Sequence, residues 1–175
     1  MFRVLMKRYN PSSKDNARKP LTKPSAWTKT GYAHSPRRIA VKTVVDAYAW
    51  IEIFIGSERG KRAKETLEQA DEVYTPDTVM AEVARKYCRE GAEERTTQAR
   101  LEIIAKASDI VPIDIKLALE AARCYTRLTR EAKKKDLTPP SLFDAIPLAA
   151  ARLLKAKILT GDEHFKNLPE TIWVK

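Results

Sequence analysis

The stretch from Ser141 to Phe165 constrains the fold more than any other part of the chain. Apolar residues recur at helical spacing from Leu142 to Leu153, and a short apolar strand around Ile158 follows within a few residues. Asp144 lies near the start of this helix, and Asp162 comes directly after the strand. Ligands of open α/β sheets bind outside the carboxyl ends of the strands, so we expect the two carboxylates to meet there.

Short strands and amphipathic helices alternate through the rest of the chain. The β-branched run 39–46 suits a buried parallel strand, and it ends on Asp46. We expect further strands at 72–75, 109–112, 157–160 and 171–174, the last at an edge of the sheet. The helices are expected at 48–55, 59–70, 77–90, 93–107, from 115 through 128, and from 142 to 153. This alternation predicts an α/β sandwich with a mainly parallel sheet.

Residues 1–40 differ in composition from the remainder and form a basic leader. They hold ten Lys or Arg and one acid, Asp15, so most of the net charge of +10 lies here. We expect this segment not to fold on its own. It is either an arm that contacts phosphate backbones or an upstream extension without a role, and the lack of helical spacing among its basic residues favours the second. The folded domain is expected to span residues 41–175.

No apolar run approaches the roughly 18 residues of a membrane helix, and the N-terminus lacks the pattern of a secretory signal. Cys88 and Cys124 both fall in helical patterns, without a CxxC motif. We expect them to be buried or half-buried thiols in a reducing compartment. These features predict a cytoplasmic protein with no membrane partner.

Four acids are candidates for one site: Asp46 and Asp162 follow strands, and Glu82 and Asp144 lie on helices that follow connecting turns. Several carboxylates together bind hard divalent cations, typically Mg²⁺. Such a cation generates hydroxide from water and neutralises charge on a phosphoryl group. Without it, convergent carboxylates repel one another and raise each other's pKa values.

Each acid also has a purely structural interpretation. Asp46 would cap the next helix, Asp162 would be a turn residue, and Asp144 would stabilise the start of its helix. Asp144 lies in an apolar neighbourhood where an idle charge is costly, which favours function. Glu82 is flanked by apolar residues, unlike an ordinary surface glutamate. The reserve candidates are Glu52 and Glu163.

Taken together, the motifs resemble those of the PIN-domain ribonucleases, and most closely the prokaryotic branch of VapC-like toxins. The motifs are Val44-Val45-Asp46, Glu82 within 75–83, Ser141-Leu142-Phe143-Asp144-Ala145, and the run 159–165. Their order and spacing make the resemblance much more specific than any one motif.

The resemblance implies a Rossmann-like three-layer sandwich with a five-stranded, mainly parallel sheet. It implies a Mg²⁺- or Mn²⁺-dependent endonuclease that hydrolyses RNA, the toxin of a toxin–antitoxin system. By motif position, Asp46, Glu82, Asp144 and Asp162 would be the metal site, with Thr160 as the hydroxyl residue beside it. A homodimer and a small antitoxin protein that inserts a segment near the site are also implied.

Three residues depart from the family pattern. Tyr48 stands where Ser or Thr is frequent and adds bulk near the expected metal. His164 stands where another acid often follows, and it would bind substrate or face solvent. Pro147 lies in the helix that starts near Ser141; it should kink that helix if Ser141 is the cap, and is harmless if the helix begins nearer Asp144.

Other classes fit less well. A receiver domain needs an acidic pair after the first strand, which Val44-Val45-Asp46 lacks. A nucleotide-binding Rossmann protein needs a Gly-rich loop there, and Asp46-Ala47-Tyr48-Ala49 offers none. The serious alternative is a catalytically inactive PIN-like module that binds RNA or protein.

Overall fold

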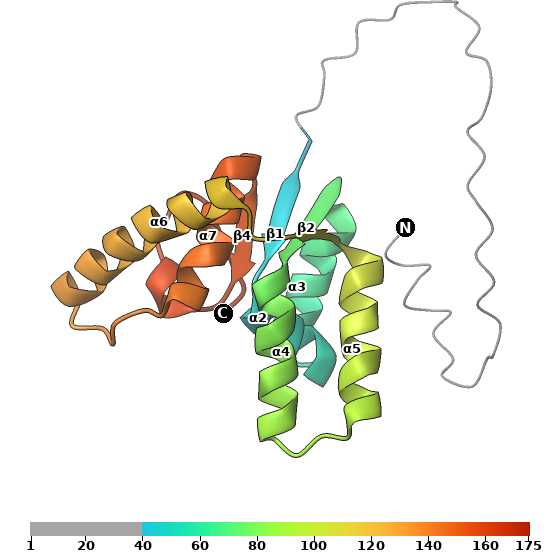
Figure 1. The fold of residues 1–175 in the computed structure, drawn as a ribbon. Helices are drawn as coiled ribbons and strands as arrows, with labels where there is room; N and C mark the ends of the chain where they lie inside the picture. The colour runs from blue at the N-terminus through green and yellow to red at the C-terminus, as the bar shows by residue number, and fades with distance from the viewer. Residues whose placement is uncertain (1–39) are drawn as a thin grey trace, which may run out of the picture.

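The computed structural model describes residues 40–175, and its elements alternate in the expected order (Figure 1). The strands are β1 (Lys42–Val45), β2 (Glu72–Pro76), β3 (Asp109–Val111), β4 (Lys157–Thr160) and β5 (Thr171–Trp173). The helices are α2 (Ala47–Ile55), α3 (Glu58–Gln69), α4 (Asp77–Arg89), α5 (Glu94–Ala107), α6 (Ile115–Lys134), α7 (Leu142–Leu154) and the 3-10 helix η1 (Glu163–Phe165).

The five strands form one sheet in the order β3-β2-β1-β4-β5, and every neighbouring pair is parallel. The predicted five-stranded parallel sheet, with the last strand at an edge, is therefore confirmed. Because all strands run in the same direction, their carboxyl ends meet at one edge of the sheet. Asp46 and Asp162 both follow strands that end there.

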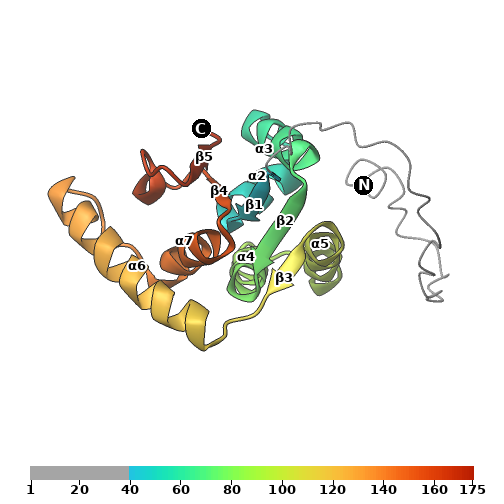
Figure 2. The same cartoon turned by 90° about the horizontal axis from the view of Figure 1, so that it is seen from above.

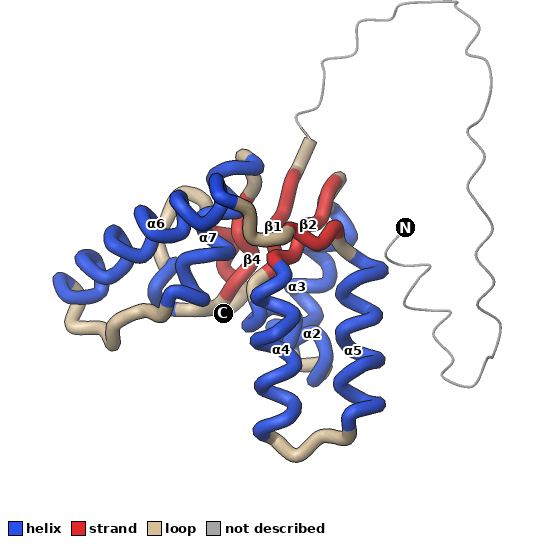
Figure 3. The backbone as a smooth tube through the Cα atoms, viewed as in Figure 1, coloured by secondary structure: helices blue, strands red, loops and turns tan. Residues whose placement is uncertain are grey.

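Helices cover both faces of the sheet and complete three layers (Figure 2). Successive strand residues point to opposite faces. Val44 and Ile158 therefore pack with the apolar side of α6 and α7, whereas Val45 and Leu159 pack with α2, α3, α4 and α5. In Figure 3 the strands run between these two groups of helices. The predicted sandwich is confirmed.

Local sequence determines where the helices begin and end. The Asp46 side chain accepts a hydrogen bond from the Ala47 amide at the start of α2. Gly56 ends that helix with a φ of 71°, a conformation that glycine adopts without steric cost. The Ser57 side chain then accepts from the Gly60 amide and caps α3.

Pro147 lies inside α7, because Ser141 is the N-cap of this helix. The proline has no N–H, so the Phe143 carbonyl loses its usual intrahelical donor. The helix nevertheless continues to Leu154, and Pro147 itself is buried.

Only one of the two cysteines is buried. Cys124 is buried, but Cys88 is exposed, which contradicts the prediction for that residue. The buried face of α4 carries Val79 and Val83, and Cys88 lies off this face.

The predicted leader, residues 1–40, lies outside the described residues except for Ala40. Within residues 40–175, no helix is both long and apolar enough to cross a bilayer.

Candidate metal centre

Asp46 is the most buried acid of the candidate site, with 7% of its surface exposed. Its Oδ1 accepts from the Ala47 amide at 2.8 Å, and its Oδ2 accepts from the Thr160 hydroxyl at 2.7 Å. Burial raises the pKa of Asp46 to about 7; the Thr160 hydrogen bond opposes this, and the nearby charges of Glu82 and Asp162 add to it. Asp46 thus both caps α2 and faces the other acids.

Thr160 connects two of the acids. Its hydroxyl oxygen accepts a hydrogen bond from the Asp162 amide at 3.1 Å, and the same hydroxyl donates a hydrogen bond to Asp46. Thr160 is fully buried, with 0% of its surface exposed. Its hydroxyl therefore contacts both acids from inside the protein.

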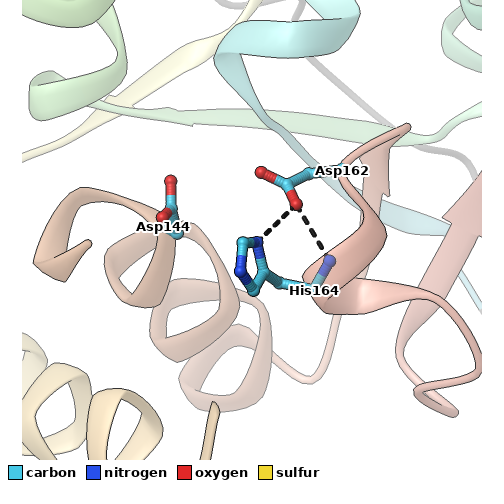
Figure 4. Close-up of side chains that lie close together, drawn as sticks. All are labelled: Asp144, Asp162 and His164. Carbon is cyan, nitrogen blue, oxygen red and sulfur yellow. Dashed lines mark hydrogen bonds and ion pairs between the residues drawn. The ribbon is translucent and has the colours of Figure 1, made fainter. Parts of the chain in front are cut away.

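Asp162 and His164 form a second pair at this edge (Figure 4). Oδ1 of Asp162 accepts from the His164 amide at 2.9 Å and lies 2.7 Å from Nδ1 of the His164 ring. Both hydrogen bonds use the same carboxylate oxygen. Oδ2 of Asp162 is consequently left as a possible ligand atom.

His164 is held at both ring nitrogens, because Nε2 lies 2.7 Å from the carbonyl oxygen of Thr138. A carboxylate and a backbone carbonyl only accept, so the ring donates from both nitrogens and is protonated in this arrangement. Burial lowers the pKa of His164, but the hydrogen bonds to Thr138 and Asp162 outweigh it and raise the pKa. Its side chain is 16% exposed, which does not favour the alternative that it simply faces solvent.

Asp144 is placed by a capping box at the start of α7. The Ser141 hydroxyl accepts from the Asp144 amide at 3.3 Å. Oδ2 of Asp144 in turn accepts from the Ser141 amide at 2.6 Å and from its hydroxyl at 2.9 Å. The structural interpretation of Asp144 therefore holds, and Oδ1 is still available as a ligand atom.

Glu82 approaches from α4, with 25% of its side chain exposed. Burial raises the pKa of Glu82, the negative charges of Asp144 and Asp162 raise it further, and Arg85 opposes the shift. The Arg85 guanidinium lies 3.9 Å from the Glu82 carboxylate.

The structure thus brings all four predicted acids within electrostatic range of one another. Ligand atoms of Asp144, Asp162 and His164 lie within 4.8 Å of one another. Asp46 interacts with Glu82 and Asp162, and Glu82 interacts with Asp144. Carboxylate oxygens are the donors that Mg²⁺ and Mn²⁺ prefer, and a cation would offset the repulsion that raises these pKa values. The residues fit such an ion, with protonated His164 as a neighbour of the ligands.

The reserve acids have other partners. The Ser57 hydroxyl donates to the Glu52 carboxylate in the turn between α2 and α3. Glu163 pairs with Lys166 at 3.6 Å and with Lys175 at 3.3 Å. These contacts favour structural roles for both.

An aromatic and basic cluster that the motifs do not single out as a unit lies beside the acids. The Tyr48 hydroxyl accepts from Arg59 at 2.9 Å, and the Lys175 ammonium lies over the rings of Tyr48 and Trp173. The available signal was position: Trp173 ends the last strand and Lys175 comes two residues later, at the same edge that Asp46 occupies.

Comparison with solved structures shows the same fold in chains of toxin–antitoxin systems. A chain of a toxin–antitoxin complex from Klebsiella pneumoniae is 22% identical, with a TM-score of 0.54 over 76% of this chain and 98% of that one. A chain of a DNA-bound VapBC complex from Salmonella typhimurium is 16% identical, with a TM-score of 0.58 over 77% and 99%. VapC20 from Mycobacterium tuberculosis, described as a sarcin-ricin loop cleaving toxin, is 20% identical, with a TM-score of 0.55 over 70% and 92%.

A search of curated proteins found no match. The sequence profile of the PIN domain, in contrast, matches residues 43–170, which include all four acids, Thr160 and His164. The resemblance inferred from the motifs is therefore confirmed: this chain belongs to the PIN domain family.

Proposed function

We propose that this protein is a cytoplasmic, metal-dependent endoribonuclease that hydrolyses RNA phosphodiesters. The observation that carries the proposal is the convergence of four carboxylates from separate segments at the carboxyl edge of a parallel sheet. Membership of the PIN domain family supports a nuclease, and the similar fold of a toxin described as cleaving the sarcin-ricin loop supports RNA as substrate.

Asp46, Glu82, Asp144 and Asp162 would hold Mg²⁺ or Mn²⁺. Such an ion, when bound, supplies an activated water and neutralises charge on the phosphoryl group. The cation has hard oxygen donors available at Oδ1 of Asp144 and Oδ2 of Asp162, because the hydrogen bonds described above engage the other oxygen of each carboxylate.

The chain's own residues orient these acids. Thr160 fixes the carboxylate of Asp46, and His164 fixes that of Asp162. Without a cation the pKa of Asp46 is about 7, and a bound cation would lower it, so Asp46 would bind the ion as a charged carboxylate. Protonated His164 places a positive charge where a phosphate would approach.

We further propose that the protein is the toxin of a toxin–antitoxin system, with a small antitoxin as partner. The similar folds of chains from toxin–antitoxin complexes support this assignment. A homodimer is part of the same proposal. Ile115 and Leu119 on α6 are 81% and 56% exposed and provide an apolar surface suited to a second copy. The mass of the purified protein in solution tests the dimer.

One observation favours the alternative of an inactive binding module. The Tyr48 ring packs directly against Gly161, next to Asp162, and adds bulk beside the acids. The same experiment distinguishes the two functions.

The test is cleavage of a panel of labelled single-stranded RNAs by the purified protein, with Mg²⁺, with Mn²⁺ and with a chelator. We expect cleavage that the chelator abolishes, and product ends without a cyclic phosphate, because a water attacks and not the ribose hydroxyl. No cleavage of any RNA by folded, antitoxin-free protein would support the binding module. Cleavage with cyclic phosphate ends would indicate a contaminating nuclease.

A further inference from the structure

Two aromatic rings lie at the same sheet edge as the acids. Tyr48 follows Asp46 by two positions, and its Cε1 would lie 2.3 Å from a Cβ at Gly161. Trp173 ends β5 and is the register partner of Thr160 on β4. Both aromatic residues are only partly buried, so each presents surface to solvent next to the candidate metal centre.

Three cations surround these rings. Nη1 of Arg59 donates to the Tyr48 hydroxyl at 2.9 Å. The ammonium of Lys175 lies 5.4 Å from the centroid of the Tyr48 ring and 5.7 Å from that of Trp173. The ammonium of Lys166 lies 5.7 Å from the Trp173 centroid. Each of the two rings therefore has at least one cation beside it.

The two lysines share one acidic partner. Both pair with the single carboxylate of Glu163, Lys166 at 3.6 Å and Lys175 at 3.3 Å. Their side chains are 54% and 29% exposed. Such solvated ammonium groups can leave a ring face and follow a phosphate at small cost.

We propose that Tyr48 and Trp173, with Arg59, Lys166 and Lys175, form a stacking platform for a nucleobase of single-stranded RNA next to the cleaved phosphate. This inference rests on the proposed ribonuclease function and adds to it the site that selects the substrate's conformation. One unpaired base stacks on the rings, and the cations contact the flanking phosphates.

The physical chemistry favours exchange of ammonium for base. Stacking of a base on an aromatic side chain is stronger than an exposed cation–π contact. The displaced ammonium then pairs with a phosphate, so little interaction energy is lost when the base replaces it on the ring. Every base has a π-face, so the platform selects unpaired RNA over duplex RNA and shows little preference for base identity.

An acidic peptide is the competing occupant, since the same cations would attract it. The platform adjoins four carboxylates, which repel an acidic peptide. RNA is also negatively charged, but its phosphate would bind to a cation held by those carboxylates. The location of the platform therefore favours RNA.

The test uses the full chain carrying Asp144→Asn, to prevent cleavage, with Mg²⁺ and a short single-stranded RNA that contains 2-aminopurine. Stacking quenches the fluorescence of this base. Tyr48→Leu and Trp173→Leu should each remove most of the quenching and weaken binding about tenfold, equivalent to roughly 1.4 kcal/mol. Tyr48→Phe should retain the quenching because it keeps the ring. Lys175→Gln should retain the quenching. The slope of log affinity against log salt concentration should become shallower by about one, because one fewer ammonium contacts a phosphate.

The matched control is Tyr125→Leu, which removes a tyrosine on α6 that is 38% exposed and should leave quenching unchanged. In the cleaving wild-type background, Tyr48→Leu and Trp173→Leu should raise KM about tenfold and leave kcat unchanged. If wild type cleaves RNA and folded platform variants match it in quenching and KM, the platform is wrong and the nuclease stands. If wild type neither binds nor cleaves RNA, both proposals fail. If these cations bind an acidic peptide instead of RNA, only the platform fails.

Discussion

The Thr160 hydroxyl donates a 2.7 Å hydrogen bond to Oδ2 of Asp46, although the two residues lie 114 positions apart in the chain. The same hydroxyl accepts from the Asp162 amide. One buried side chain therefore joins the carboxyl ends of β1 and β4 and sets the relative position of two acids. The arrangement makes Thr160 a positioning residue.

Replacement of Thr160 by valine tests this role. Thr160→Val keeps the shape of the side chain but removes the hydrogen-bond partner of the Asp162 amide and of Oδ2 of Asp46. We expect it to lower the free energy of unfolding by about 1–3 kcal/mol and cleavage by about 10- to 100-fold. Thr160→Ser should recover most of both.

Thr43 provides the matched control. It is also fully buried, and its hydroxyl has no hydrogen-bond partner among residues 40–175. Thr43→Val should be neutral or stabilising in urea unfolding, because it removes an unsatisfied polar group. Equal effects of the two valine substitutions would contradict the role of Thr160.

The pKa of Asp46 predicts how stability depends on pH without metal. The ordinary value is 3.8 and the folded value is about 7, so the folded state retains a proton that the unfolded state has released. The free energy of unfolding should therefore fall as pH rises from about 4 to about 7, on the order of 4 kcal/mol in total. Asp46→Asn cannot titrate and should lack this contribution. Urea unfolding of wild type and Asp46→Asn in chelator, at about pH 5 and pH 7.5, measures the difference in pH dependence. An equal pH dependence of the free energy of unfolding in the two proteins would contradict the prediction.

Divalent cations should reverse that loss. Because Mg²⁺ or Mn²⁺ would bind the folded state alone, it should stabilise by about 2.7 kcal/mol at a concentration 100 times Kd. The melting temperature at neutral pH should rise with added Mn²⁺ in wild type and rise less in Asp144→Asn. A chelator should restore the starting value. An unchanged melting temperature in wild type would argue against a metal centre.

Gly60 marks a close approach between α2 and α3. A Cβ at this position would lie 2.0 Å from the carbonyl oxygen of Glu52. Gly60→Ala should therefore destabilise by about 2 kcal/mol or more, whereas a glycine to alanine change inside a helix ordinarily stabilises by up to about 1 kcal/mol. Thermal unfolding measures the difference, and a gain in stability would show that the two helices pack less closely.

Most of the fold follows from local sequence. β-Branched strands such as β1 and the side-chain caps at Ser57 and Ser141 indicate where elements begin, and the alternation of elements predicts a parallel sheet. Asp46 and Asp162 could be selected as site residues because each follows a strand within two residues. Their place at the carboxyl edge of the sheet follows from the parallel topology.

The partners of these acids could not be predicted in the same way. His164 is held by the carbonyl of Thr138, which lies 26 positions earlier in the loop before α7. The platform combines Tyr48, Trp173 and Lys175 from opposite ends of the described chain. Such contacts depend on how loops and the edge strand pack, which neither periodicity nor spacing specifies.

The most direct test of the metal-dependent nuclease compares RNA cleavage by wild type, Asp144→Asn and Asp109→Asn in Mg²⁺ and in chelator. Asp109 is an exposed acid at the start of β3, on the opposite edge of the sheet, and its substitution makes the same chemical change. We expect wild type and Asp109→Asn to cleave equally in Mg²⁺. Asp144→Asn should lose about 100-fold or more, because removal of a cation ligand costs several kcal/mol of charge stabilisation. Cleavage that survives Asp144→Asn, or that persists in chelator, would contradict the account.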